Sequence, residues 1–156
     1  MPKLSAGLLV HRPGPDGGRQ VLLVHPGGPF WAKKDDGAWS IPKGETGPMG
    51  DADLLAQAER EFAEELGQPA PAGPRVPLGE VVQSGGKHVV AWAVDGDLDV
   101  TTVDSNRFEI EWPPRSGRRQ SFPEVDRAGW FAVADARRKL VPAQVAFLDR
   151  LVALLL

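Results

Sequence analysis

Three glutamates lie close together in one short stretch of the sequence, Glu61, Glu64 and Glu65. On a helix surface, residues three and four apart are neighbours, so these carboxylates would converge. Hard divalent cations such as Mg²⁺ prefer oxygen ligands, which carboxylates supply. Arg60 precedes Glu64 by four residues and is placed to hold its carboxylate. The pattern therefore indicates a magnesium site, with a solvated acidic helix face as the alternative.

A helix that can carry these glutamates is predicted in the second half of residues 44–67. Asp51 or Asp53 can cap its start, because a short acidic side chain accepts hydrogen bonds from free backbone N–H groups there. Gly67 can end it, because glycine adopts the left-handed conformation at a helix C-terminus. An apolar face follows from the helical spacing of Leu55, Ala58, Phe62 and Leu66.

The segment in front of this helix, WSIPKGE, is a short strand-like run that ends on a glycine turn. The run covers residues 39–41, and Lys43 follows it in a position where it can meet a phosphate. Gly44 lets a ligand approach the backbone closely, because it has no Cβ atom. The order of strand, glycine turn and glutamate-bearing helix favours the metal site over the solvated face.

This arrangement resembles the Nudix hydrolase family. The sequence box of that family is G-x5-E-x7-R-E-U-x-E-E-x-G-U, where U is a bulky apolar residue. Residues 60–67, REFAEELG, match the C-terminal part of the box, and residues 42–44, PKG, match its usual lead-in. The specific motif covers residues 39–67, and the order of elements resembles the family over most of the chain.

The sequence departs from the box at three places. The segment from Gly44 to Arg60 is two residues longer than the box allows. Counted back from Arg60, the isolated glutamate of the box falls on Ala52, and the nearest carboxylate is Asp51. Gln68 stands where the box has an apolar residue. The three helix glutamates are not affected by these departures.

The resemblance implies an α/β fold, namely a Nudix-type α/β/α sandwich with a mixed sheet and helices on both faces. The pattern of the chain predicts the same layout in one domain over residues 1–156, because strands precede and follow one helix and two more helices end the chain. The predicted strands cover residues 4–12, 20–25, 39–41, 78–83, 88–94, 107–112 and 130–131. The later helices are predicted at residues 135–140 and from Pro142 onward, and residues 113–124 are predicted as a loop.

The resemblance also implies hydrolysis of a nucleoside diphosphate linked to another moiety. Mg²⁺, with Mn²⁺ as a substitute, would be held by Glu61, Glu64, Glu65 and the carbonyl of Gly44. Arg60 would support these ligands. For the base that activates water, Glu124 is the first choice, since family members often take the base from a loop before a late strand, and Glu64 is the second.

Several further residues are candidates for substrate binding. Lys43, Lys87 and the cluster of Arg115, Arg118 and Arg119 are placed to meet phosphates, because arginine binds phosphate oxygens bidentately. A solvated basic loop is the alternative for the arginines. Trp39 can stack on a nucleobase, as can the aromatic residues of the loop before it, Phe30 and Trp31. The alternative is that Trp39 belongs to the core and Phe30 plugs its own loop.

Composition narrows the remaining choices. The chain has 156 residues, a formal charge of −3 and no cysteine. The mild acidity gives no support for binding to a nucleic acid polymer or a membrane, and the lack of cysteine excludes disulfides and thiolate sites. We expect a soluble cytoplasmic protein, since the N-terminus lacks the features of a signal peptide.

Two substrate classes remain open, a nucleoside triphosphate and a dinucleoside polyphosphate. The alternative of a different kind is a non-catalytic Nudix-fold module that binds a nucleotide as a sensor. The intact REFAEE sequence argues against the sensor, because such a module needs no metal cluster. A homodimer is compatible with the sequence.

Overall fold

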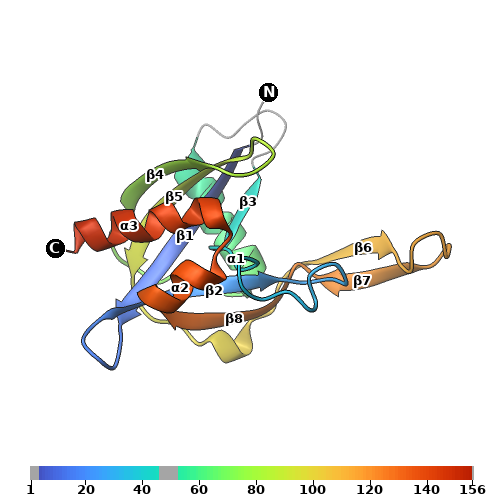
Figure 1. Cartoon of the computed structure of the whole chain (residues 1–156), viewed down its shortest axis with the longest axis horizontal. Coiled ribbons are helices and arrows are strands. Elements are labelled where there is room, and N and C mark those ends of the chain that lie inside the picture. Colours follow the sequence, from blue (N-terminus) through green and yellow to red (C-terminus); the bar gives the residue numbers. More distant parts are fainter. Residues whose placement is uncertain (1–3, 46–52, 156) are drawn as a thin grey trace.

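A mixed β-sheet forms the centre of the chain in the computed structural model, which describes residues 4–45 and 53–155. The strand order in the described sheet is β4-β5-β1-β2-β8 (Figure 1). Strand β2 pairs with the second half of β1, and β3 pairs with the first half. The sheet strands are β1 (Leu4–Pro13), β2 (Arg19–Pro26), β3 (Lys43–Glu45), β4 (Val76–Val82), β5 (His88–Asp95) and β8 (Val125–Ala132). The β1–β5 pair is parallel and the other pairs are antiparallel, so the sheet is mixed as predicted.

Helices cover both faces of this sheet. One face packs against α1 (Leu54–Leu66), and the other packs against α2 (Val133–Lys139) and α3 (Val145–Leu154). Two short 3₁₀ turns, η1 (Val100–Thr102) and η2 (Pro142–Gln144), complete the helical elements. The predicted α/β/α sandwich is confirmed. None of the helices in the described ranges has the length and apolar character needed to cross a bilayer.

Strand β1 is buried on both faces because it lies at the centre of the sheet. Its residues alternate between the two cores: Leu8 and Val10 pack in the cluster under α1, and Leu9 packs in the cluster under α3. A strand with helices on both faces is a continuous apolar run instead of an alternating one. This explains the sequence AGLLV in β1.

The helix α1 has the boundaries that its sequence indicates. Asp53 is the N-cap, and its side chain accepts a hydrogen bond from the Ala56 N–H at 3.0 Å. Gly67 ends the helix with φ 73°, and its N–H bonds to the Ala63 carbonyl. The other candidate cap, Asp51, lies outside the described residues. The buried face contains Ala58, Phe62 and Leu66, while Leu55 is half-buried.

The prediction of a loop at residues 113–124 is wrong for its second half. Residues Arg119–Pro123 form β7, which pairs antiparallel with β6 (Arg107–Glu111), and Phe108 lies opposite Phe122. Figure 1 shows this β6–β7 hairpin projecting from the sheet as a two-stranded arm. The sequence did not reveal β7, because a strand this short is defined by its partner more than by its own pattern.

Gly67 allows a direct test of how α1 is anchored. A Cβ atom on Gly67 would lie 2.5 Å from the carbonyl oxygen of Asp104, whereas one on Gly17, with a similar φ of 81°, would meet nothing within 4 Å. We expect Gly17→Ala to cost only the left-handed backbone penalty of about 1–2 kcal/mol. Gly67→Ala should cost clearly more in the free energy of unfolding, measured by urea denaturation. Equal losses would show that the Asp104 segment moves freely.

Candidate active site

A small cavity brings together three of the predicted site residues from three separate elements. Lys43 comes from β3, Glu65 from the last turn of α1, and Glu124 from the junction between β7 and β8. The cavity has a volume of about 140 Å³, and its other walls are Val24, Pro26, Ser40, Ile41 and Val125. Two carboxylates and one ammonium group therefore line the same hollow.

Glu65 is the most perturbed of these groups. Burial raises the pKa of its carboxyl group from an ordinary 4.5 to about 8, against the opposing charge of Lys43. The charges of Glu61 and Glu124 raise this pKa further, and a hydrogen bond from the backbone N–H of Lys43 lowers it. Its buried Oε2 atom has no hydrogen-bond partner among the described residues. A buried oxygen of this kind has a lone pair free for an external ligand.

Lys43 is half-buried beside this carboxylate. Burial lowers the pKa of its ammonium group, and the charges of Glu65, Glu45 and Glu61 raise it. The charge of Lys87 also lowers the pKa of Lys43, and Lys87 itself lies 3.5 Å from Glu45. The structure therefore places Lys87 close enough to Lys43 for the two charges to interact.

Glu61 lies directly against Gly44. A Cβ atom placed on Gly44 would be 2.0 Å from both Cδ and Oε2 of Glu61, so only glycine leaves room for this carboxylate. Gln57 holds the other oxygen, since its Nε2 donates to Glu61 Oε1 and to the carbonyl of Glu45, both at 2.9 Å. Burial, then the charges of Glu64 and Glu124, raise the pKa of Glu61.

The charge of Glu64 acts on two other carboxyl groups of the site. It raises the pKa of Glu61, and it raises the pKa of Glu124, where burial is the larger cause. Arg60 is exposed, and its charge lowers the pKa of Glu61. In the described part of the chain, no three acidic or histidine side chains are spaced as a closed metal cage.

The donors nevertheless fit a hard cation. The available oxygens are the unpartnered Oε2 of Glu65, the carboxylate of Glu61 and the nearby backbone of Gly44. Mg²⁺ prefers oxygen ligands of this type and keeps several waters, so it needs few protein ligands.

Two residues that position the site were not predicted from the sequence. Gln57 is almost fully buried on the same helix face as Glu61, four residues earlier. Gln144 is fully buried, and its Oε1 accepts a hydrogen bond from the Ile41 N–H at 2.9 Å. It thereby ties the strand-like run before Lys43 to the start of α3. A polar residue inside an apolar helix pattern is the signal that could have revealed Gln57.

The base-stacking role expected for Trp39 is wrong in this structure. Trp39 is 5% exposed, and its ring contacts His25 and Phe131 edge-on, with centroid distances of 5.1 and 4.9 Å. Its indole Nε1 donates to Asp35 Oδ1 at 2.7 Å. Trp39 is therefore a core residue, because neighbouring side chains already cover its ring.

The three arginines are placed on the projecting hairpin. Arg115 and Arg118 lie in the connection between β6 and β7, and Arg119 is the first residue of β7. All three are exposed. Arg118 precedes Glu124 by six residues, which is about 20 Å along an extended strand. These side chains therefore belong to the hairpin and not to the group of carboxylates. Their contact with a phosphate stays a prediction.

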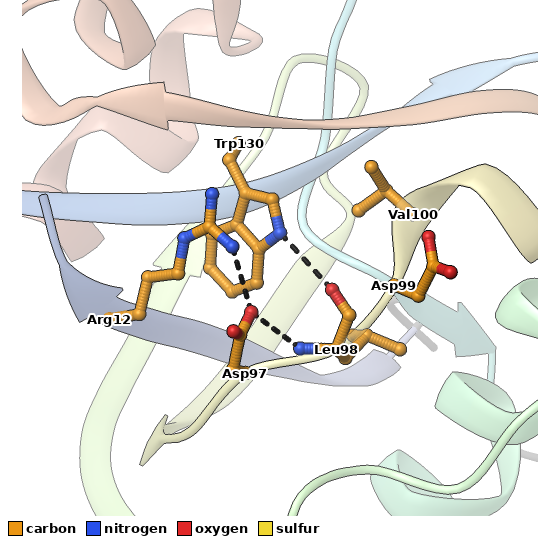
Figure 2. A pocket seen from close by; sticks show the side chains of 6 residues that line it. All are labelled: Arg12, Asp97, Leu98, Asp99, Val100 and Trp130. Carbon is orange, nitrogen blue, oxygen red and sulfur yellow. Dashed lines mark hydrogen bonds and ion pairs between the residues drawn. The ribbon is translucent and has the colours of Figure 1, made fainter.

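A larger hollow than this cavity lies elsewhere. Its volume is about 490 Å³, and it is at the end of β1 that is remote from the Lys43 pairing (Figure 2). Arg12 lies 4.0 Å above the ring of Trp130 and pairs with Asp97 at 2.8 Å. The Trp130 Nε1 donates to the Leu98 carbonyl. These polar groups satisfy one another, so the hollow is not a candidate for the chemistry.

Comparison with known proteins identifies the family. The NUDIX domain family model matches residues 1–151, and the chain therefore belongs to this family. The predicted resemblance is confirmed. No curated protein sequence matches the chain significantly.

Solved structures show the same fold. An Ap4A hydrolase from C. elegans in a binary complex has a TM-score of 0.67 at 20% identity, with 97% of each chain covered. The NUDIX domain of NrtR from Shewanella oneidensis, complexed with ADP ribose, has a TM-score of 0.65 at 17% identity, covering 100% of this chain and 90% of that one. A MutT protein from Methanosarcina mazei Go1 has a TM-score of 0.60 at 19% identity, covering 97% and 93%.

The buried carboxyl group of Glu65 predicts a pH-dependent cost to stability. Below about pH 4.5 the group is protonated in both the folded and the unfolded chain, so it costs nothing. As the pH rises toward about 8, the unfolded chain ionises first, and the folded chain loses stability. Glu65→Gln removes this effect. In EDTA, we expect the melting temperature of Glu65→Gln to exceed that of the wild type by a margin that grows from pH 5 to pH 8.

The matched control is Glu109→Gln, which changes an exposed glutamate on β6. Its melting temperature should differ from that of the wild type by an amount that does not vary with pH. A Glu65→Gln margin that is equally flat would contradict the burial of an ionisable carboxyl group at this position.

Proposed function

We propose that this chain is a Mg²⁺-dependent pyrophosphohydrolase that cleaves a diphosphate bond in a nucleotide-type substrate, either a nucleoside triphosphate or a dinucleoside polyphosphate. The observation that carries the proposal is the shared cavity of Lys43, Glu65 and Glu124, beside the carboxylates of Glu61 and Glu64. In the reaction, water adds to a phosphorus atom and the bridging P–O bond breaks. Two products leave, and each carries a phosphate group at the cleaved end.

The helix carboxylates are the proposed metal ligands. Glu61, Glu64, Glu65 and the Gly44 carbonyl would hold Mg²⁺, with Mn²⁺ as a substitute. The bound ion would neutralise phosphate charge and lower the pKa of a coordinated water. The space beside Gly44 and the unpartnered Oε2 of Glu65 support this assignment.

Glu124 is the proposed general base. It lines the same cavity as Glu65, and its pKa is raised by burial and by the charge of Glu64, which makes it a better proton acceptor than an ordinary carboxylate. Lys43 would hold a phosphate oxygen, because its buried ammonium group faces the same cavity. Arg60 would limit the repulsion among the helix carboxylates through its charge on Glu61.

The dinucleoside polyphosphate class has support from the comparisons, since one similar structure is an Ap4A hydrolase. Another similar structure holds ADP ribose, which also carries a diphosphate between two larger groups. For this chain, the dinucleoside polyphosphate is one of the two substrate classes that we propose.

The metal requirement gives the first test of this function. Purified protein is incubated with a panel of nucleoside triphosphates and diadenosine polyphosphates, with Mg²⁺ or with excess EDTA. We expect turnover with Mg²⁺ and its loss in EDTA. Glu64→Gln should remove most turnover without changing the melting temperature by more than a few degrees, whereas Asp16→Asn in the β1–β2 turn should be normal. Full activity in EDTA would contradict a metal-dependent reaction.

The role of Glu124 predicts a specific kinetic change. Glu124→Gln keeps the size of the side chain but cannot accept a proton, so kcat should fall about 10²–10⁴-fold. KM should change little, because a base acts in the transition state and not in ground-state binding. Steady-state kinetics on the best panel substrate measure both constants. If Glu124→Gln keeps a near-normal kcat while Glu64→Gln is inactive, the base lies on α1.

A further inference from the structure

The connection between η1 and β6, residues 103–106, joins the end of α1 to the β7–β8 junction that carries Glu124. The last carbonyl groups of a helix have no partner within the helix. Here the N–H of Asp104 donates to the Leu66 carbonyl at 3.2 Å, and the N–H of Asn106 donates to the Glu64 carbonyl at 3.0 Å. The carbonyl of Asn106 in turn accepts the N–H of Glu124 at 2.8 Å. Asn106 is therefore bonded on one side to the helix turn of the proposed metal ligands and on the other side to the proposed base.

The side chain of Ser105 makes a second contact between this connection and the junction. A hydroxyl group has one proton to donate and two lone pairs that accept. The Oγ atom of Ser105 accepts the N–H of Val125 at 3.1 Å. Its own proton is within reach of two carbonyl oxygens, those of Val125 at 3.1 Å and Asn106 at 2.9 Å. One half-buried side chain therefore meets both backbone groups of the residue that follows Glu124.

Val125 depends on this contact because its neighbour in the sheet cannot replace it. Val125 is 5% exposed, and its partner in β2 is Pro26, which has no N–H to donate. The pairing of β2 with β8 also shifts its register at this point, between His25 and Pro26. Buried backbone groups need hydrogen bonds. The Ser105 hydroxyl thus supplies what a regular neighbouring strand would otherwise give.

The loop after β2 holds the other side of the junction. The N–H of Gly27 donates to the carbonyl of Glu124 at 2.9 Å. A Cβ atom on Gly27 would lie 1.9 Å from the carbonyl oxygen of Pro123, so the two segments are in direct contact. The backbone of Glu124 is therefore bonded on both sides, while its side chain lines the cavity. The Ser105 contact is made by a side chain, so a substitution can remove it without changing the backbone.

The position of Glu124 needs such a restraint. A general base acts only within hydrogen-bond reach of the proton that it accepts, about 2.6–3.2 Å. The charge of Glu64 acts on Glu124, and two carboxylates repel each other when both are ionised. Without a restraint on its backbone, Glu124 would move away from the carboxylates of α1.

We propose that Ser105 is a positioning residue for the reaction, because its bond to the backbone of Val125 fixes where Glu124 lies relative to the carboxylates of α1. The proposal rests on the proposed function, since it takes Glu124 as the base. Ser105 lies outside residues 39–67, which contain the family box, and it is not one of the residues that line the cavity. It therefore acts through Glu124 and touches no reacting atom.

Steady-state kinetics on the best panel substrate test this role. Ser105→Ala should lower kcat by up to about 10²-fold, because a small displacement of the base is enough to slow the reaction. KM should stay unchanged, since the base acts in the transition state. Ser105→Thr keeps the hydroxyl group and should retain the wild-type kcat. Ser105→Cys keeps the size of the side chain but carries a weakly hydrogen-bonding thiol, so its kcat should fall like that of Ser105→Ala.

A double variant separates positioning of the base from a general effect on the fold. When added to Glu124→Gln, Ser105→Ala should lower kcat by less than about 2-fold, because both changes act through the same group. Thr102→Ala is the matched control, since this nearby hydroxyl group bonds to the Asp99 carbonyl at 3.2 Å and not to the junction. It should keep the wild-type kcat.

Three results would overturn the proposal. The first is an unchanged kcat in both Ser105→Ala and Ser105→Cys. The second is a loss that appears mainly in KM. The third is a loss of kcat from Ser105→Ala that is equally large in the Glu124→Gln background, because Ser105 would then act on another part of the protein.

Hydrogen–deuterium exchange separates this proposal from the proposed function, because it needs no turnover. The N–H of Val125 should exchange faster in Ser105→Ala than in the wild type, and at the wild-type rate in Thr102→Ala. A wild type that hydrolyses no panel substrate but shows this faster exchange in Ser105→Ala would disprove the hydrolase and support the hold of Ser105 on the junction. A wild type with normal turnover, matched by Ser105→Ala in both kcat and exchange, would disprove the positioning role alone.

Discussion

The burial of the Glu65 carboxyl group beside the Lys43 ammonium group is the constraint on which the rest of the site depends. Both groups lose water, and burial is the first cause of both pKa shifts. Such a pair repays its desolvation only in part, so it must be held by other interactions. The packing of Phe62 and Leu66 into the sheet supplies them, because these two fully buried residues fix the helix turn that carries Glu65.

The same constraint explains the small and polar residues around the carboxylates. Glu61 can approach the glycine turn only because Gly44 has no Cβ atom, and Gln57 fixes its orientation with a hydrogen bond. Gln144 acts from the other side, by holding the backbone of Ile41 just before Lys43. The glycine turn is therefore positioned by the start of α3, and the helix α1 is positioned separately by the core beneath it. A preorganised cluster of repelling charges requires this kind of support.

A structural feature can be predicted from the sequence when the residues that cause it are close together in the chain. The cap, the stop at Gly67 and the apolar face of α1 are local signals. The stop and the apolar face were predicted correctly, and Asp53 is one of the two aspartates predicted as the cap. Whether Trp39 is buried could not be predicted from the sequence, because its burial depends on contact with Phe131, which is distant in the chain. Strand β7 was missed for a similar reason, since its pairing with β6 defines it. Local patterns thus revealed the candidate metal ligands, while the surroundings of the aromatic residues required the fold.

The residues that match the family box and the segments attached around them lie in different parts of this molecule. The turn and helix match a sequence box shared across a family, and structures with about 20% identity keep the fold while their bound or named ligands differ. A fold shared this widely does not determine the substrate, so selectivity must come from what is attached to it. In this chain the loop after β2 begins at the cavity residue Pro26, and its Phe30 contacts Trp112, which follows β6.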